Sequence, residues 1–331
     1  MYSLIRRLLF LLDAEAAHDL TVAQMTRLQQ IPLVLRVIAR LCRAPRVPRR
    51  VWDLRFDSPI GIAAGFDKNA LMMPFLAALG FGFLEVGTVT LHPQPGNPRP
   101  RIFRDSDRGA LINRLGFNND GADAIAERLQ RWRESDSPQP PLFVNVGKNR
   151  DVPLDRAADS YAHCYLRVAR WADGCVLNVS SPNTPALREL QRPEHLEVVL
   201  RLVRSMRDQM VFPSEGLHPL LVKIAPDLDA TQLREICEVC TTLADGLVCT
   251  NTSATEQGGI SGRPLFGPST AVVREVRAAS SPDYPLIGVG GIFTAADAQE
   301  KLTAGANLVQ IYTGFVYEGP ALPARLARAL A

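Results

Sequence analysis

Eight short apolar runs recur along the chain from residue 60 onward, and they constrain its fold more than any other feature. Each run leads into a polar or glycine-rich loop and then into a stretch with helical periodicity. The runs span residues 60–64, 83–86, 142–146, 175–179, 220–224, 246–249, 286–289 and 308–311. Continuous apolar strands that alternate with helices are typical of a parallel sheet, and eight of them predict a closed (β/α)8 barrel, the TIM-barrel form of the α/β class. A Rossmann-type sheet is the alternative, but no G-x-G-x-x-G motif opens a helix after the first run.

Two further segments carry strand-like residues outside these runs. Between the second and third runs, residues 101–104 and 110–112 are separated by a polar turn, which predicts a hairpin inserted at the barrel mouth. Residues 51–57 predict another strand, placed ahead of the barrel. We therefore expect the barrel unit to cover residues 51–331.

The first fifty residues differ from the rest of the chain in charge. They contain nine Arg and no Lys against three acidic residues, a formal charge of +6. The whole chain carries +3, so the remaining residues carry −3. A total of +3 is too small to indicate nucleic-acid binding. The segment is therefore a basic appendage on a mildly acidic body.

The same segment has the periodicity of two or three short helices. Apolar residues at positions 4, 5, 8, 9 and 12 share one helical face, Asp13 suits the N-cap of a second helix, and Pro32 can begin a third. Such helices can lie in a membrane interface or pack on the barrel as an ordinary extension, and their leucine and arginine content favours the membrane. No apolar run approaches the roughly 20 residues needed to cross a bilayer. No cleavage site follows the short run at 8–12, so we expect neither a membrane span nor a signal peptide.

The six cysteines are scattered along a long chain, which fits a reducing compartment and buried thiols. Cys237 and Cys240 form a C-x-x-C motif inside residues 232–243, which have helical periodicity. No second Cys or His pair stands at metal-binding spacing, so we interpret both as helix residues. No other His, Cys, Asp or Glu cluster has metal-ligand character, and we expect no metal.

In a barrel of this kind the active site lies at the C-terminal ends of the strands. Gly290 and Gly291 follow the seventh run, and with Gly262 they can bring bare backbone N–H groups to a phosphate. Lys68 and Lys223 are the lysines that we place at strand ends. Lys223 can be a Schiff-base nucleophile or a cation beside an electron-rich cofactor ring, and the barrel alone does not decide between these roles.

The fourth run opens into Asn178, Ser180, Ser181 and Asn183, a cluster of amides and hydroxyls. An amide offers two donors and an acceptor without carrying charge, which suits the edge of a flat heterocycle with C=O and N–H groups. Taken alone, the stretch is more often a turn. Its place at the mouth of a barrel strand favours a binding site.

Long motifs cover the strand ends and the loops that follow them. They are residues 63–69 (AAGFDKN), 85–90 (EVGTVT), 93–101 (PQPGNPRPR), 113–119 (NRLGFNN), 178–185 (NVSSPNTP), 223–227 (KIAPD), 259–265 (GISGRPL) and 288–292 (GVGGI). Together they resemble the dihydroorotate dehydrogenase family, and the resemblance runs from Met1 to about residue 320. The helical N-terminus resembles that of the membrane-associated, quinone-using class 2 in its bacterial form. Ser181, where soluble class 1 members carry Cys, supports the same class.

The resemblance implies bound FMN and oxidation of (S)-dihydroorotate to orotate in de novo pyrimidine (UMP) biosynthesis, with a membrane quinone as electron acceptor. The residues that match FMN-binding positions are Ala64, Gly65, Lys68, Thr88, Asn145, Asn178, Lys223, Thr250, Gly262, Gly291, Tyr312 and Thr313. Those that match substrate-binding positions are Lys68, Asn113, Arg114, Leu115, Gly116, Phe117, Asn178, Asn183, Asn251 and Thr252. Those that match the quinone tunnel are His18, Arg101 and Tyr312.

Ser181 matches the catalytic base, which removes the C5 proton while the C6 hydride passes to flavin N5. Because a free hydroxyl is a poor base, we hypothesise that Thr184 and a bound water relay the proton while Phe117 helps exclude solvent. We also expect a monomer on the cytoplasmic side of the inner membrane. Residues 1–50 would contact the lipid surface and form an apolar route for the quinone. The alternative is a colourless Schiff-base barrel lyase that uses Lys223.

One departure from the family pattern is visible. The loop of residues 252–258 is shorter than the family's usual segment at this place. Asn251 and Thr252 are present at the start of this loop, so we expect substrate recognition to be retained. The resemblance does not fix how this loop covers the site.

Overall fold

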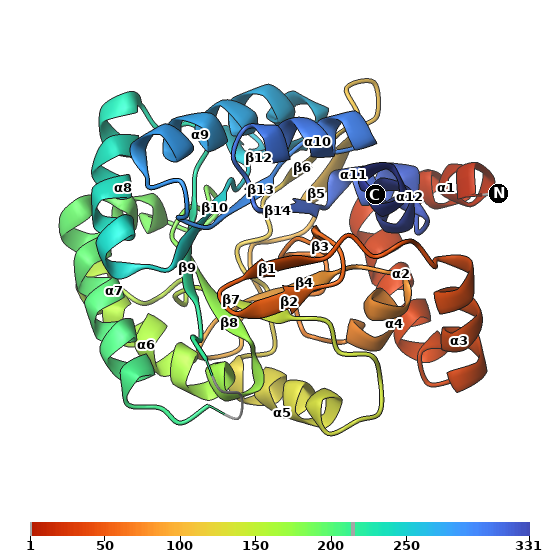
Figure 1. Ribbon diagram of the computed structural model, residues 1–331, viewed down its shortest axis with the longest axis horizontal. Coiled ribbons are helices and arrows are strands. Elements are labelled where there is room, and N and C mark those ends of the chain that lie inside the picture. The colour runs from red at the N-terminus through yellow and green to blue at the C-terminus, as the bar shows by residue number, and fades with distance from the viewer. Residues whose placement is uncertain (1, 213–215) are drawn as a thin grey trace.

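The barrel predicted from the eight apolar runs is present and closed (Figure 1). The computed structural model describes residues 2–212 and 216–331, so Met1 lies outside the described residues. The eight strands are parallel and follow one another in chain order, and the last pairs with the first where Val309 lies beside Ile60. All their residues are buried, because helices cover the outside and side chains fill the inside. The strands are β3 (Ile60–Ile62), β4 (Phe83–Val89), β7 (Leu142–Val146), β8 (Gly174–Asn178), β9 (Leu220–Ile224), β10 (Gly246–Cys249), β13 (Leu286–Val289) and β14 (Leu308–Ile311).

Helices surround the barrel (Figure 1). They are α4 (Met73–Ala78), α5 (Ala122–Arg133), α6 (Ala157–Val168), α7 (Pro193–Asp208), α8 (Ala230–Leu243), α9 (Phe266–Ala279), α10 (Ala295–Thr303), α11 (Thr313–Glu318) and α12 (Leu322–Leu330), with 3-10 turns at η1 (Leu154–Arg156), η2 (Ala169–Trp171), η3 (Leu187–Gln191) and η4 (Arg263–Leu265). Asp229 and Gln232 form a capping box that begins α8. Cys237 and Cys240 lie on the buried face of that helix, as their interpretation as helix residues predicted. Cys42 is only partly buried, so the expectation of buried thiols holds for the other five cysteines.

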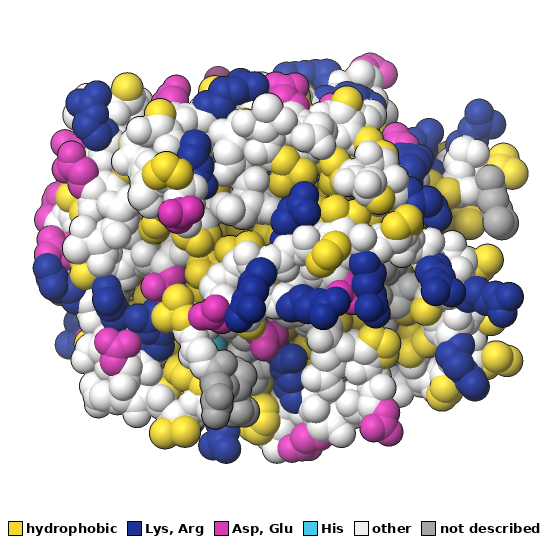
Figure 2. All heavy atoms as spheres, in the orientation of Figure 1, with side chains coloured by type: hydrophobic (Ala, Val, Ile, Leu, Met, Phe, Trp, Pro, Cys, Tyr) yellow, Lys and Arg dark blue, Asp and Glu magenta, His cyan; other side chains and the backbone are white. Residues whose placement is uncertain are grey.

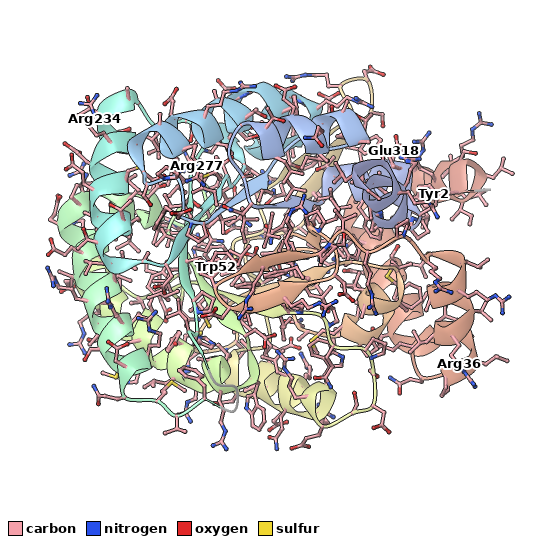
Figure 3. All side chains as sticks on the ribbon, in the orientation of Figure 1. Tyr2, Arg36, Trp52, Arg234, Arg277 and Glu318 are labelled. Carbon is pink, nitrogen blue, oxygen red and sulfur yellow. The ribbon has the colours of Figure 1, made fainter. Side chains whose placement is uncertain are left out.

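The segment ahead of the barrel differs from the single strand predicted at residues 51–57. It is an antiparallel hairpin of β1 (Arg49–Val51) and β2 (Leu54–Phe56), because Trp52 and Asp53 take positive φ angles of 53° and 62° and reverse the chain. Trp52 lies near the middle of the barrel in Figure 3, and its indole N–H donates to the Asp245 carbonyl at 2.6 Å. Its ring packs against those of Phe56 and Phe143, with centroids 6.4 and 5.6 Å away. The hairpin thus adds its aromatic residues to the interior of the barrel.

The hairpin predicted between the second and third barrel strands is confirmed as β5 (Ile102–Asp105) and β6 (Ala110–Asn113). It is half of a four-stranded antiparallel sheet that continues through β12 (Gly258–Gly262) to β11 (Ser253–Thr255). The short loop at residues 252–258 is therefore a second hairpin rather than irregular chain. Its pairing sets Gly259 opposite Asn113, a predicted site residue.

Three helices precede the barrel, as the periodicity predicted: α1 (Tyr2–Leu11), α2 (Ala14–Leu28) and α3 (Pro32–Leu41). The Asp13 carboxylate accepts backbone N–H bonds at 2.9 and 3.1 Å and caps α2. The three helices lie on one side of the barrel, next to α4, α11 and α12 (Figure 1). Arg6 donates to the Tyr317 carbonyl at 2.7 Å, and Gln29 donates to the Leu71 carbonyl at 2.6 Å. These bonds join the helices to the barrel at separate points.

Candidate active site

A cavity with a volume of about 990 Å³, including its part open to solvent, lies at the C-terminal ends of the barrel strands. Strand ends and the four-stranded sheet contribute its walls. Most of the residues predicted from the sequence meet there. They are Ala64, Gly65, Lys68, Thr88, Asn113, Leu115, Gly116, Phe117, Asn178, Ser181, Asn183, Lys223, Thr250, Asn251, Thr252, Gly262, Gly291, Tyr312 and Thr313.

Side-chain amides form a hydrogen-bonded chain across one wall of this cavity. Asn178 Nδ2 donates to Thr88 Oγ1 at 2.9 Å and to Asn145 Oδ1 at 3.1 Å. Asn251 Nδ2 donates to Asn178 Oδ1 at 3.1 Å and to Ser180 Oγ at 3.1 Å. Asn145, predicted to bind FMN, is fully buried and does not line the cavity, and its Oδ1 accepts from both the Thr88 hydroxyl and Asn178. Amides held in this way present fixed donors and acceptors to a ligand.

A charged cluster below this wall was not predicted from the sequence. Glu85 is fully buried, with Oε1 lying 3.5 Å from the Lys223 ammonium and accepting from Asn145 Nδ2 at 2.6 Å. Glu85 Oε2 accepts from the Gln310 amide. The signal in the sequence was a polar residue inside each of two apolar runs, since such residues are rarely buried without a purpose. Glu85 is a buried counter-charge for the Lys223 ammonium, which favours a role of this lysine as a cation beside a cofactor ring over that of a free amine nucleophile.

Asn113 and Asn183 approach each other on the side of the cavity formed by the sheet. Asn183 Nδ2 donates to Asn113 Oδ1 at 3.1 Å, and Asn113 Nδ2 donates to the Gly259 carbonyl at 3.3 Å. Ser181 is 6% exposed, and its hydroxyl accepts the Asn183 backbone N–H at 3.2 Å. The nearby Thr184 hydroxyl is buried and has no partner among the described residues. An unpaired buried hydroxyl next to a candidate base is available to a bound water or a ligand.

A glycine turn directly follows β13 and forms another side of the cavity, where it packs against η4. Gly290 and Gly291 have φ angles of +116° and +73°, which favour glycine over every other residue. A Cβ on Gly290 would meet the Ser269 hydroxyl, and one on Gly291 would meet Phe266. Both glycines line the cavity with their backbone, as does Gly262. Exposed backbone N–H groups at such a turn suit a phosphate group.

Lys68 lies where the cavity meets the N-terminal helices. Its ammonium is 3.2 Å from Nε2 of His18 on α2. Burial lowers the pKa of Lys68 to about 8, although Asp19 and Glu15 act to raise it. Burial, and then the charge on Lys68, hold the pKa of His18 well below its usual value. The His18 imidazole is therefore neutral at pH 7 and can accept a hydrogen bond from Lys68.

A second cavity, of about 1390 Å³ including its open part, lies between the N-terminal helices and the barrel. Its lining is mainly apolar and comes from α1, α2, the β5–β6 hairpin and the start of α11. His18 and Tyr312, two of the residues predicted for the quinone tunnel, line it. Tyr312 also lines the polar cavity, and its hydroxyl donates to the Gly65 carbonyl at 3.3 Å. One tyrosine thus separates a polar compartment from an apolar one.

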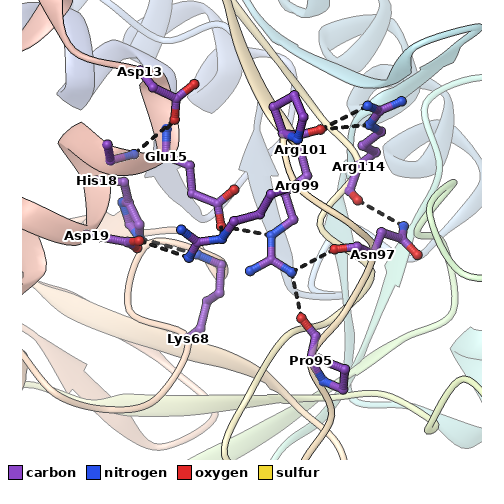
Figure 4. Close-up of polar contacts among 12 residues, drawn as sticks. Asp13, Glu15, His18, Asp19, Lys68, Pro95, Asn97, Arg99, Arg101 and Arg114 are labelled. Carbon is purple, nitrogen blue, oxygen red and sulfur yellow. Dashed lines mark hydrogen bonds and ion pairs between the residues drawn. The ribbon is translucent and has the colours of Figure 1, made fainter.

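Arg101, the third residue predicted for the tunnel, does not line the apolar cavity. It is 6% exposed and pairs with Glu15 on α2 at 2.8 Å (Figure 4). It also donates to the carbonyls of Pro95 and Asn97, at 2.6 and 3.0 Å. Arg101 therefore joins α2 to a barrel loop, because a buried guanidinium needs a carboxylate and carbonyl partners. Arg104, two residues after β5 begins, lines the cavity in its place.

The Arg114 side chain also lies elsewhere than predicted. It is not among the residues that line the polar cavity, and its guanidinium donates twice to the Pro100 carbonyl, at 3.1 and 2.9 Å. It lies over the Phe103 ring, with Cζ 5.3 Å from the centroid. Successive residues at a strand end point to opposite sides, so Asn113 faces the cavity and Arg114 faces away from it. Arg114, predicted among the substrate-binding residues, therefore has its side chain outside the lining of the polar cavity.

The outer side of the N-terminal helices is unusually apolar. Leu8, Leu11 and Leu41 are 68%, 82% and 75% exposed. In Figure 2 hydrophobic and basic side chains alternate over the right-hand side of the molecule, where Figure 1 places α1, α2 and α3. Within the described parts of the chain, none of the helices is both long and apolar enough to pass through a bilayer.

Comparison with known proteins places the chain among related sequences and structures. A family model described as dihydroorotate dehydrogenase matches residues 47–331. Curated proteins named dihydroorotate dehydrogenase (quinone) from Alkalilimnicola ehrlichii and Paraburkholderia phymatum are each 46% identical to it. The similarity covers 100% of this chain and 99% and 98% of theirs. A crystal structure of DHODH in complex with ferulenol from Eimeria tenella has a TM-score of 0.86 at 35% identity, covering 96% of this chain and 90% of that chain.

Proposed function

Because the chain belongs to the dihydroorotate dehydrogenase family, we propose that it oxidises (S)-dihydroorotate to orotate in pyrimidine biosynthesis, with a membrane quinone as electron acceptor. The observation that carries this proposal is the pairing of a polar, amide-lined cavity with an apolar one across Tyr312. An enzyme that passes electrons from a polar acid to a lipid-soluble quinone needs both compartments. A Schiff-base lyase at Lys223 would need neither the apolar cavity nor the ion pair with Glu85.

The polar cavity suits the chemistry of dihydroorotate. Orotate is a planar imide ring with a carboxylate, so neutral amides can bind its edge while a cation binds its charge. Asn113, Asn178, Asn183 and Asn251 supply the amides, and Lys68 supplies the cation. These are the predicted substrate residues, and they converge from four separate segments of the chain.

The family is flavin-dependent, and the residues of this cavity fit FMN. The turn of Gly290 and Gly291 has no room for a Cβ and leaves backbone N–H groups for the phosphate. When bound, FMN supplies the acceptor for the hydride from C6 of the substrate. Lys223, held by Glu85, places a positive charge at the strand ends to stabilise negative charge on the ring.

Ser181 acts as the base that takes the C5 proton of dihydroorotate. A hydroxyl is a weak base, so its proton must leave as it acts. The unpartnered Thr184 hydroxyl can hold a water that carries the proton away. Phe117 lines the same cavity and helps to exclude bulk solvent. The proposed route takes the proton from the substrate to Ser181 and then to the water held by Thr184.

Residues 1–50 form the quinone's entrance, and residues 51–331 form the FMN-binding barrel. The exposed leucines and arginines of the three helices would rest on the lipid surface, and they support the proposal that the protein attaches to the cytoplasmic side of the inner membrane, where we expect it to be a monomer. A quinone could then pass from the bilayer along the apolar cavity as far as Tyr312 and His18 without crossing water.

Replacement of the proposed base tests this assignment. In Ser181→Ala, reduction of the bound flavin by dihydroorotate without oxygen should slow by about 100-fold or more, because general-base catalysis contributes that much. Thr184→Val should give a smaller loss. Ser160→Ala removes a buried hydroxyl on α6 that has no partner in the described part of the chain, and as the matched control it should leave the rate unchanged. Near-normal reduction in Ser181→Ala would exclude the serine as base.

A further inference from the structure

Lys301 is a buried charge that the proposed reaction does not use. The chain has only four lysines against 33 arginines, and Lys301, on α10, is the most deeply buried of them at 0% exposure. Its ammonium donates to Ser269 Oγ at 2.7 Å and to Thr270 Oγ1 at 2.8 Å. It also lies 5.0 Å from the centroid of the Phe266 ring. Among the described residues no carboxylate forms an ion pair with it, and an ammonium without a counter-charge is costly to bury.

The contacts of this ammonium lead directly to the glycine turn of the cavity. Ser269, which accepts its hydrogen bond, donates to the Leu265 carbonyl at 2.7 Å, and its hydroxyl fills the place that a Cβ on Gly290 would occupy. Phe266, beneath the ammonium, packs in the same way against Gly291. Leu265, Gly290 and Gly291 all line the polar cavity. Lys301 therefore stands behind the turn, separated from its backbone by one layer of side chains.

We propose that Lys301 supplies the positive charge that holds the phosphate of FMN in this glycine turn, acting through the wall rather than by direct contact. The inference rests on the proposed function, because it takes FMN as the ligand. The backbone N–H groups of the turn give direct hydrogen bonds but carry no net charge, whereas a phosphate ester carries about −1.5 to −2 at pH 7. In a low-dielectric wall the attraction between an ammonium and that charge remains strong at a distance. Lys301 is thus a positioning residue for the cofactor.

The surroundings of Lys301 set the pH at which this charge is lost. Burial lowers its pKa to about 7, while Cys249 on β10 and Glu300 and Asp297 on its own helix act to raise it, and Arg274 on α9 acts to lower it. The protonated form attracts the phosphate, so bound FMN must raise this pKa further. FMN should therefore bind more weakly as the pH rises from 7 to 9.

Flavin fluorescence can measure the dissociation constants of FMN and of riboflavin, which lacks the phosphate, for the full chain freed of flavin. Lys301→Met should weaken FMN binding by about tenfold or more, within the usual range of coupling between two sites, and leave riboflavin binding unchanged. Lys148→Met is the control, because Lys148 is also buried, at 2% exposure, but donates to the Val152 carbonyl away from the turn. Its preference for FMN over riboflavin should match that of the native protein.

An unchanged preference in Lys301→Met would overturn the inference, and so would an equal loss of both flavins, which indicates a packing role alone. If that variant does not fold, the pH dependence of flavin binding by the native protein tests the inference. An FMN dissociation constant that rises between pH 7 and 9, with riboflavin constant, supports the inference, and a constant FMN value contradicts it. A native protein that binds neither flavin would instead overturn the proposed cofactor, and the inference with it.

Discussion

The four lysines show how this chain divides its basic residues. Arginine carries most of the surface charge, whereas Lys68 lines the polar cavity and Lys148, Lys223 and Lys301 are all buried. A lysine changes its protonation state more readily than an arginine when it is desolvated. Lys68 lines the polar cavity and its pKa is lowered to about 8, so its charge can respond to a ligand bound there.

The charge of Lys68 predicts the pH dependence of substrate binding. Its pKa is lowered to about 8, so the ammonium is charged below pH 8 and becomes neutral above it. The rate constant kcat/KM for dihydroorotate should therefore fall above pH 8, by about 10- to 100-fold in all, because the substrate carboxylate loses a charged hydrogen bond. A base such as Ser181 would change the rate in the opposite direction.

Steady-state rates between pH 7 and 9.5 measure this effect, and Lys68→Met is the comparison. That variant should have a low kcat/KM with no fall above pH 8. A fall of the same size in Lys68→Met would assign the titration to another group.

At the residue scale, the sequence predicted the polar side chains that line the cavity but not the buried residues that hold them in place. Ser181 and Asn183 stand out because they follow an apolar run, whereas Glu85 and Gln310 are hidden inside such runs. The ion pair of Arg101 was not foreseen because its partner, Glu15, lies 86 positions away and no local pattern joins them. Long-range pairing of charges is a property of the folded chain.

At the scale of elements, the apolar runs predicted all eight barrel strands, because a strand buried on both faces must be continuously apolar. The β1–β2 hairpin was missed because its turn depends on left-handed backbone at two successive residues, Trp52 and Asp53, and tryptophan is not a typical turn residue. The β11 strand was missed because its three residues, Ser253, Ala254 and Thr255, are too few to show a strand pattern. Both elements depend on a neighbouring strand with which their backbone can pair.

The N-terminal helices carry the prediction that belongs to this scale. Replacing Leu8, Leu11 and Leu41 by Ser should reduce the fraction of protein that sediments with phosphatidylglycerol-containing vesicles by about tenfold or more, because each exposed leucine contributes to burial in the interface. Quinone turnover should fall with it, while flavin reduction by dihydroorotate stays unchanged.

The matched control replaces exposed apolar residues on the barrel. Leu166 and Val198 are 38% and 58% exposed on α6 and α7, far along the chain from the three helices. Their replacement by Ser should not alter vesicle binding. Equal binding by the native protein and the N-terminal variant would show that the three helices do not attach the molecule to lipid.

For the whole molecule, the arrangement of two cavities explains why a helical extension accompanies this barrel. The barrel provides a polar site at its strand ends, and the helices build an apolar compartment against the same face. Tyr312 lies between them, and His18 reaches from the helices to Lys68. The substrate site and the quinone site of the proposed reaction therefore meet at Tyr312, and the flavin would bind next to this residue.

The visible spectrum of the purified protein without oxygen, before and after dihydroorotate is added, tests this account most directly. We predict a flavin band that bleaches on addition of dihydroorotate and returns when a short-chain quinone follows, since both substrates must reach the same cofactor. A flavin band that does not respond to dihydroorotate would contradict the substrate. A colourless protein that takes up no FMN would contradict the dehydrogenase reaction as a whole.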